Sequence, residues 1–175
     1  MVRGDLTVGL DIGTTQIRAI VADHGDNGHV KITGVGTSPS DGLKRGVVVN
    51  VEKTVGSIQR AIEKAEKMSD TKVASVYAGI AGDHIRSFNS RGVIAVSGPE
   101  SEINRNDESR VIEAAKAISI PMDREIIHVL PQSFVVDDQP GIRDPIGMSG
   151  VRLEADVHMV TGAVTSAQNI CKSIR

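Results

Sequence analysis

The chain has 175 residues, enough to bury roughly 70% of the surface that its unfolded form exposes, so one domain or two small ones are expected. A net charge of −2 and an aromatic content of 2% argue against nucleic acid as a partner, because basic tracts and stacking platforms are missing. The single cysteine, Cys171, excludes an internal disulfide and is typical of a reducing cytosol. Without a signal peptide or an apolar run of about 18 residues, the chain is expected to be soluble and cytoplasmic.

Short apolar runs alternate with turns in the first part of the chain. Runs at 6–10, 17–22 and 30–35 predict three strands with tight connections, and therefore antiparallel hairpins. Turn-forming residues are frequent at 24–28, between the second and third runs. The proline and glycines of 38–46 predict a loop.

A helix and a fourth strand are expected next. Apolar residues recur at three- and four-residue steps from Val51 to Met68, and Asn50 is the candidate N-cap, which predicts an amphipathic helix with one buried face. The run Val73–Ile80 is apolar enough to lie inside a sheet. The pattern changes after Gly82, which indicates a boundary between two parts of the chain.

The second part begins with a predicted hairpin and a helix. Residues 84–97 resemble two strands around the turn formers of 89–92. Asn104 and Asn106 are candidate caps of a second amphipathic helix, and Pro121 prevents its continuation.

Two strands, a loop and a last helix complete the expected order. The strand 124–136 contains Pro131, which suggests a sheet edge or a bulge, and 139–150 is a predicted loop. Apolar and polar residues alternate strictly over 151–159, as in a half-exposed strand. A helix over 166–175 still carries its apolar ridge at the last residue, which favours a segment of a longer chain.

One stretch, V-G-L-D-I-G-T-T-Q at 8–16, could bind phosphate. A turn that presents Gly13, Thr14, Thr15 and Gln16 supplies consecutive backbone N–H groups, with threonine hydroxyls as further donors. Asp11 at the strand end could hold Mg²⁺ through its water shell. The same residues also suit an ordinary turn, and the spacing is neither that of a Walker A loop nor that of a Rossmann fingerprint.

Other reactive side chains are expected to be structural. The five histidines lack metal-ligand spacing, and Cys171 lies on an apolar helix face, which predicts a small core residue. Asp137 and Asp138 are neighbours on opposite sides of the chain and are expected in loop and water. No catalytic residue is predicted.

The turn resembles the first phosphate loop of the actin, Hsp70 and sugar-kinase superfamily, and the whole chain resembles the FtsA family of actin-like bacterial cell-division proteins. The residues that carry this resemblance are V-G-L-D-I-G-T-T at 8–15, G-V-G-T-S-P-S-D-G-L-K-R-G at 34–46, S-V-Y-A-G-I-A-G-D-H-I at 75–85, H-V-L-P-Q-S-F-V-V-D at 128–137 and the run 141–158.

The resemblance implies an α/β fold: an incomplete actin-like, ribonuclease-H-like subdomain 1A at 1–83 and 161–175, interrupted by an inserted α+β subdomain 1C at 84–160. It also implies that Asp11, Gly13, Thr14, Thr15 and Gln16 face the phosphates of ATP, with Asp11 binding Mg²⁺ through water. Because this sequence contains no second turn of the same kind, tight ATP binding and hydrolysis by the segment alone are not expected. Whether the longer protein is a weak ATPase stays open.

The family's properties define the expected partners. The longer protein would polymerise, link FtsZ filaments to the membrane at the division site, and recruit late divisome proteins such as FtsN through subdomain 1C. Both FtsZ and membrane would be reached by regions beyond residue 175, and the segment itself could form a homo-oligomer through an unpaired sheet edge. The alternatives are a module like the pilus-assembly protein PilM and, less favoured, a sugar or acetate kinase.

Overall fold

The computed structural model describes residues 6–25, 28–97 and 101–175. Two compact units make up the chain. The first unit contains the residues up to His84 together with Val164–Arg175, and the second contains Ile85–Ala163. The turn formers predicted at 24–28 include 26–27, which lie outside the described residues.

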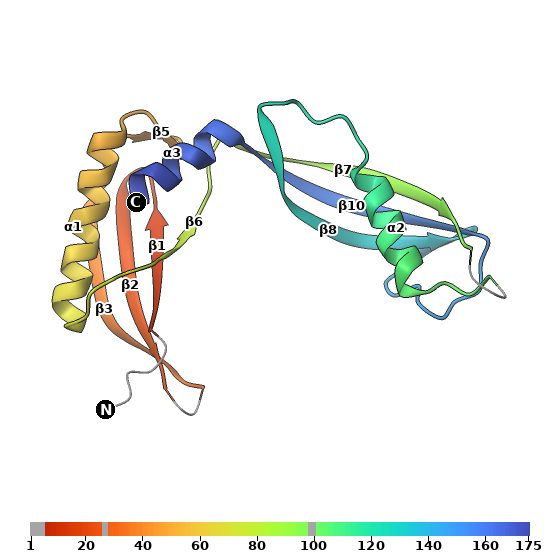
Figure 1. Cartoon of the computed structure of the whole chain (residues 1–175), viewed down its shortest axis with the longest axis horizontal. Helices are drawn as coiled ribbons and strands as arrows, with labels where there is room; N and C mark the ends of the chain where they lie inside the picture. The colour runs from red at the N-terminus through yellow and green to blue at the C-terminus, as the bar shows by residue number, and fades with distance from the viewer. Residues whose placement is uncertain (1–5, 26–27, 98–100) are drawn as a thin grey trace. The chain divides into compact units, whose positions relative to one another are not determined.

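The first unit is built on a four-stranded sheet (Figure 1). Its strands, in the order β3-β2-β1-β6, are β3 (Val30–Pro39), β2 (Gln16–His24), β1 (Leu6–Ile12) and β6 (Tyr77–Gly79). The first three are antiparallel neighbours, which confirms the predicted hairpins, whereas β6 runs parallel to β1.

Two predictions about this sheet need correction. The third strand extends to Pro39, which is paired with Gln16, so the loop predicted from residue 38 begins later and contains the small hairpin of β4 (Leu43–Lys44) and β5 (Val47–Val48). The fourth strand, predicted over 73–80 inside a sheet, is only three residues long and is exposed. Its one neighbour in the described sheet is β1, so β6 is an edge strand.

The predicted helix is α1 (Val51–Ser69), and the Asn50 side chain caps it by accepting the Lys53 N–H at 2.9 Å. It packs closely on β3, where a Cβ on Gly36 would lie 1.8 Å from the Ala61 carbonyl oxygen. The core between helix and sheet consists of Val8, Leu10, Ile17, Ala19, Val21, Ile58, Ala61 and Ala65.

The last helix, α3 (Val164–Ile174), also belongs to the first unit. Its buried residues are Ile170 and Ser173, and Ile174 packs against the core. The prediction that Cys171 is a core residue is wrong, because the buried face of α3 is centred on positions 170, 173 and 174 and leaves Cys171 exposed.

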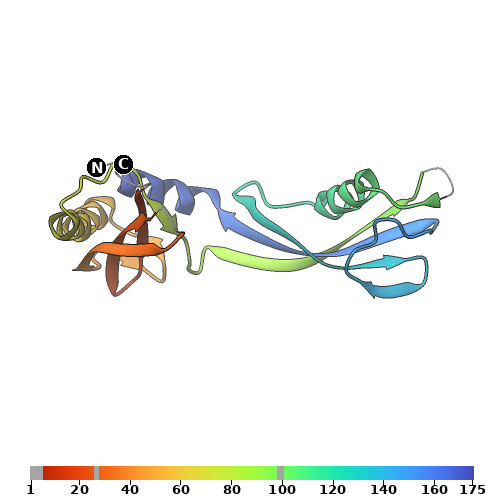
Figure 2. The same ribbon diagram turned by 90° about the horizontal axis from the view of Figure 1, so that it is seen from below.

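The second unit is an antiparallel sheet with one helix on it. The strand order is β7-β10-β8-β9, with β7 (Ile85–Ala95), β8 (Arg124–Val136), β9 (Gln139–Ile142) and β10 (Arg152–Ala163). Helix α2 (Arg105–Lys116), in green, lies along one face of this sheet (Figure 2). Its core combines α2 residues such as Val111 and Ala115 with Phe134 and Met159 from the strands.

The hairpin predicted over 84–97 is wrong, because these residues form one continuous strand. Each residue of β7 pairs with β10, from Ile85 opposite Gly162 to Ala95 opposite Arg152. Gly92, predicted to form a turn, lies inside the strand, where a Cβ would come 2.1 Å from the Val111 carbonyl oxygen. This glycine therefore allows α2 to approach the sheet.

Other predictions for the second unit are largely confirmed. A bulge beside Pro131 shifts the register between β8 and β10, and β9 pairs with β8 only beyond it, at Phe134 and Val136. The alternation of β10 buries the four residues Leu153, Ala155, Val157 and Met159, although Val151 is 68% exposed. The loop predicted over 139–150 begins instead with β9.

Candidate functional site

The predicted phosphate turn joins β1 to β2 in the first unit. Ile12 and Ile17 are the last register partners of the two strands, so Gly13, Thr14 and Thr15 connect them and Gln16 begins β2. Both threonines are exposed. The structure therefore brings these predicted residues together on one tight, solvent-facing connection.

Two backbone features determine the shape of this turn. A Cβ on Gly13 would lie 2.7 Å from the Gln16 carbonyl oxygen, so a larger residue would force the turn open. The Thr15 carbonyl accepts the Ser40 N–H at 3.1 Å, which ties the turn to the residue that follows β3. The close approach at Gly13 and the hydrogen bond at Thr15 thus fix the backbone of the turn, while both threonine side chains remain exposed.

Asp11 lies directly opposite Arg18 across the hairpin. Their charged groups are 3.8 Å apart, and both side chains are more than half exposed, so the pair contributes little to stability. Arg18 Nε also donates to Gln16 Oε1 at 3.1 Å. Arg18 was missed in the sequence, although hairpin counting reveals it, because a turn centred between Gly13 and Gln16 puts residue 11 opposite residue 18.

A second element reaches the same place. Strand β6 runs parallel to β1, and Gly79 is the register partner of Asp11. Since both strands point the same way, their carboxyl ends meet at the edge of the sheet that carries the turn. No local pattern in the sequence links residue 79 to residue 11, so only the sheet topology reveals this neighbour.

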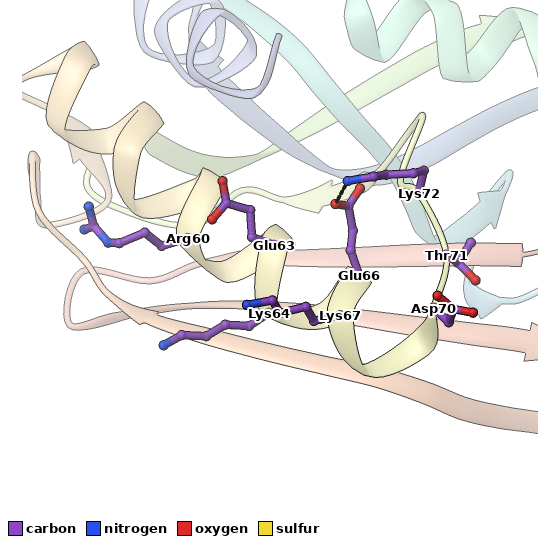
Figure 3. A pocket seen from close by; sticks show the side chains of 8 residues that line it. All are labelled: Arg60, Glu63, Lys64, Glu66, Lys67, Asp70, Thr71 and Lys72. Atoms are coloured by element: carbon purple, nitrogen blue, oxygen red, sulfur yellow. Dashed lines mark hydrogen bonds and ion pairs between the residues drawn. The ribbon is translucent and has the colours of Figure 1, made fainter.

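A hollow lies away from this turn, along the outer surface of α1 (Figure 3). It measures about 660 Å³, and charged side chains of α1 line it. Lys72 Nζ donates to the Glu66 carboxylate at 2.8 Å, and this bond together with the Val73 N–H lowers the pKa of Glu66. Lys64 donates to the Thr37 carbonyl at 2.8 Å. Such internally bonded charges are typical of a solvated helix face.

The side chains predicted to be structural include two hydrogen-bonded histidines. His158 contacts Asn89 at 2.7 Å and His24 contacts Thr7 at 3.0 Å. Among the described residues, no group of three or more His, Cys, Asp or Glu side chains is placed to hold a metal ion.

The two adjacent aspartates have different surroundings. Asp138 is exposed, as predicted, and its ion pair with Arg152 is on the surface. Asp137 is half-buried, and its Oδ1 accepts the N–H groups of Val151 at 3.0 Å and Arg152 at 2.9 Å. Asp137 therefore fastens the start of β10 and is less exposed to water than predicted.

Helices long and apolar enough to cross a membrane are absent from the part of the chain that the structure describes.

Comparison with known proteins gives a consistent result. A family described as "SHS2 domain inserted in FTSA" matches residues 82–161. The chain is 51% identical over 172 residues to cell division protein FtsA of Pseudomonas aeruginosa, 47% identical over 170 residues to that of Borreliella burgdorferi, and 40% identical over 169 residues to that of Escherichia coli K12. These matches cover 97% to 98% of this chain and 40% to 41% of the relatives, so the chain spans well under half of their length.

Among solved structures, the chain is similar to a chain of a PilM-PilN type IV pilus biogenesis complex, with a TM-score of 0.62 and 14% sequence identity. The similarity covers 97% of this chain and 44% of that chain, and at this identity it speaks for the fold alone. The chain therefore has a mixed α/β fold like that of this neighbour, and residues 82–161 match an SHS2 domain. Over the length that it shares with them, the chain is similar to these cell division proteins throughout, and residues 82–161 match the SHS2 domain that is inserted in FtsA.

Proposed function

We propose that this chain is the first nucleotide-contacting part of an actin-like cell-division scaffold, with an interaction subdomain inserted in it. The observation that carries the proposal is an identity of 40% to 51% with cell division proteins over nearly the whole chain. We assign 1–83 and 161–175 to part of subdomain 1A and 84–160 to subdomain 1C. The units of the structure divide within a few residues of these limits.

ATP with Mg²⁺ is the proposed ligand of the β1–β2 turn. Gly13, Thr14, Thr15 and Gln16 supply backbone and hydroxyl donors to phosphate oxygens, and Asp11 holds Mg²⁺ through water. The exposure of both threonines and of Asp11 supports this assignment, because a ligand can reach them without displacing protein. Arg18 adds a positive charge beside Asp11 that offsets the charge of a triphosphate.

The partners follow from the same family assignment. FtsZ and the membrane are reached through regions outside this sequence, on the cytoplasmic face of the inner membrane at the division site. Subdomain 1C contacts neighbouring subunits and late divisome proteins such as FtsN. Self-association of the chain itself is supported by the exposed edge strand β6, whose three residues are all exposed.

A PilM-like role in pilus assembly is the second candidate, favoured by the similarity in fold to a chain of the PilM-PilN complex. At 14% sequence identity that similarity concerns the fold, whereas the matches to cell division proteins reach 51%. We therefore place the division role first.

Complementation tests the division role. A chimera of Pseudomonas aeruginosa FtsA, with this chain in place of the matching segment, is expressed in cells depleted of their own FtsA. We expect it to restore septation, and the Asp11→Ala chimera to fail. The matched control is the Glu63→Ala chimera, which removes an exposed carboxylate from α1. Cells that express this chimera should still divide. Continued filamentation with the unsubstituted chimera, present at normal levels, would contradict the proposal.

Two measurements test the chain by itself. Calorimetry should detect no low-micromolar affinity for MgATP, because the chain supplies only one side of a two-lobed site. Each tenfold fall in affinity corresponds to about 1.4 kcal/mol of missing contacts. Sedimentation velocity over a concentration series, with and without the cytoplasmic tail of FtsN, should show self-association and a complex with the tail. A monomer at every concentration, with no binding to the tail, would contradict both expectations. Partner recruitment would then depend on other regions of the protein.

A further inference from the structure

We infer that Gly79, at the carboxyl end of β6, forms a second wall of the phosphate site, and that its missing side chain leaves room for a nucleotide phosphate. This inference rests on the proposed function, because it adds a residue to the proposed ATP site. The connection is the parallel pairing of β6 with β1, in which Gly79 is the register partner of Asp11.

The first argument concerns the edge of the sheet. In open α/β sheets, ligands bind beyond the carboxyl ends of parallel strands. Strands β1 and β6 are the parallel pair of this sheet, and they run side by side in the same direction (Figure 1). Asp11 is near the end of β1, and Gly79 is the last residue of β6. Both residues therefore border the position where such a ligand would lie.

The second argument concerns the face of the sheet. Val8 and Leu10 of β1 are buried in the core beneath α1, so Gly9 and Asp11 point to the opposite face. Register partners on adjacent strands share a face, so Gly79 lies on the same side as Asp11. A metal held by Asp11 and a phosphate passing Gly79 would thus be on one side of the sheet.

The third argument concerns why position 79 holds glycine. A Cβ on Gly79 would meet no described atom within 4 Å, and its φ is outside the left-handed region that favours glycine. By contrast, a Cβ on Gly36 or Gly92 would come within 2.1 Å of a helix carbonyl oxygen. Glycine weakens a strand and often marks a place where a ligand or another backbone approaches closely. Since no neighbour in the described unit requires it, we assign the space to the ligand.

The test uses the full-length chimera described above and MgATP as the probe. We expect Gly79→Val to weaken MgATP binding by at least about tenfold in calorimetry, and Gly79→Ala to weaken it less. The melting temperature without nucleotide should stay unchanged in both variants. Gly9→Val is the matched control. Gly9 is on the same face and also has no neighbour within 4 Å of an added Cβ, but it lies two residues further from the turn. The affinity of the Gly9→Val chimera for MgATP should stay within about twofold of the unsubstituted chimera.

The possible results separate the two proposals. Unchanged affinity in Gly79→Val, with normal binding by the unsubstituted chimera, would overturn this inference alone. A lower melting temperature without nucleotide in both Gly79 variants would also overturn it, because the space would then be filled by another part of the polypeptide. An unsubstituted chimera that folds but does not bind MgATP would overturn the proposed ATP site, and this inference with it.

Discussion

Gly46 and Gly82 pass each other so closely that neither position has room for a side chain. A Cβ on Gly46 would lie 2.6 Å from the Cα of Gly82, and a Cβ on Gly82 would lie 2.7 Å from the Cα of Gly46. The Asp83 N–H donates to the Arg45 carbonyl at 3.1 Å beside this crossing. The hairpin of β4 and β5 thereby holds the segment that follows β6.

Alanine at either glycine should therefore destabilise the protein. Both residues have positive φ, 78° for Gly46 and 149° for Gly82, so a clash adds to backbone strain. We expect Gly46→Ala to lower the free energy of unfolding by about 2 to 4 kcal/mol in urea denaturation. Gly141→Ala is the control, because φ there is 79° with no neighbour within 4 Å, and it should cost about 1 kcal/mol. Equal losses would show that the crossing adds nothing.

Alanine substitutions at two glycines of α1 and β3 should change the free energy of unfolding in opposite directions. Gly36→Ala should cost about 3 kcal/mol, because its Cβ would collide with the backbone carbonyl of Ala61. Gly56→Ala, inside α1 and near only the flexible end of Arg60, should stabilise by about 0.5 to 1 kcal/mol. Chemical denaturation of both variants checks the signs, and a stable Gly36→Ala protein would mean that the helix can move away from the sheet.

The start of α2 depends on a buried carboxylate. Asp107 accepts the Asn104 N–H at 3.3 Å and the Arg110 guanidinium at 2.8 Å, and its side chain is 1% exposed. Asp107→Ala should cost about 2 kcal/mol, because it removes half of the capping box and leaves the Asn104 N–H without this partner. Glu108→Ala, in the same first turn, should cost less than about 1 kcal/mol. Urea denaturation measures both, and faster hydrogen exchange at the Asn104 amide should accompany the first.

Stability at low pH should depend on Glu66. The Lys72 and Val73 hydrogen bonds lower the pKa of Glu66 in the folded state. The carboxylate therefore contributes its full stability at pH values above the pKa of about 4.3 that it has in the unfolded chain. That contribution is lost as the pH falls through the lowered folded pKa. Glu66→Gln should show a smaller loss of stability over this range, measured by urea denaturation at successive pH values.

The partner of Glu66 gives the matching effect at high pH. Glu66 raises the pKa of Lys72 in the folded state. The stability that charged Lys72 contributes is therefore fully present at pH values below its unfolded pKa of about 10.4, and it is lost as the pH rises through the raised pKa. Glu63→Gln is the control for the acid range, because Glu63 is an exposed carboxylate of the same helix and forms no ion pair with another residue that the structure describes. An identical acid profile for Glu66→Gln and the unsubstituted chain would contradict this account.

The sequence by itself determined the elements whose side chains face one core. The three- and four-residue spacing of α1, the Asn50 and Asn104 caps and the alternation of β10 all appear in the structure, because each depends on neighbours a few residues away. It also determined the turn from Gly13 to Gln16, whose glycine and hydroxyl residues are adjacent along the chain.

Tertiary structure decided everything that depends on residues far apart in the sequence. The turn formers around Gly92 lie in a continuous strand, because pairing with β10 and the approach of α2 outweigh local turn preference. Cys171 is exposed because the core contacts select a different face of α3. Gly79 lies beside Asp11 only because β6 adds in parallel to β1, a pairing between distant segments that no local pattern of side chains specifies.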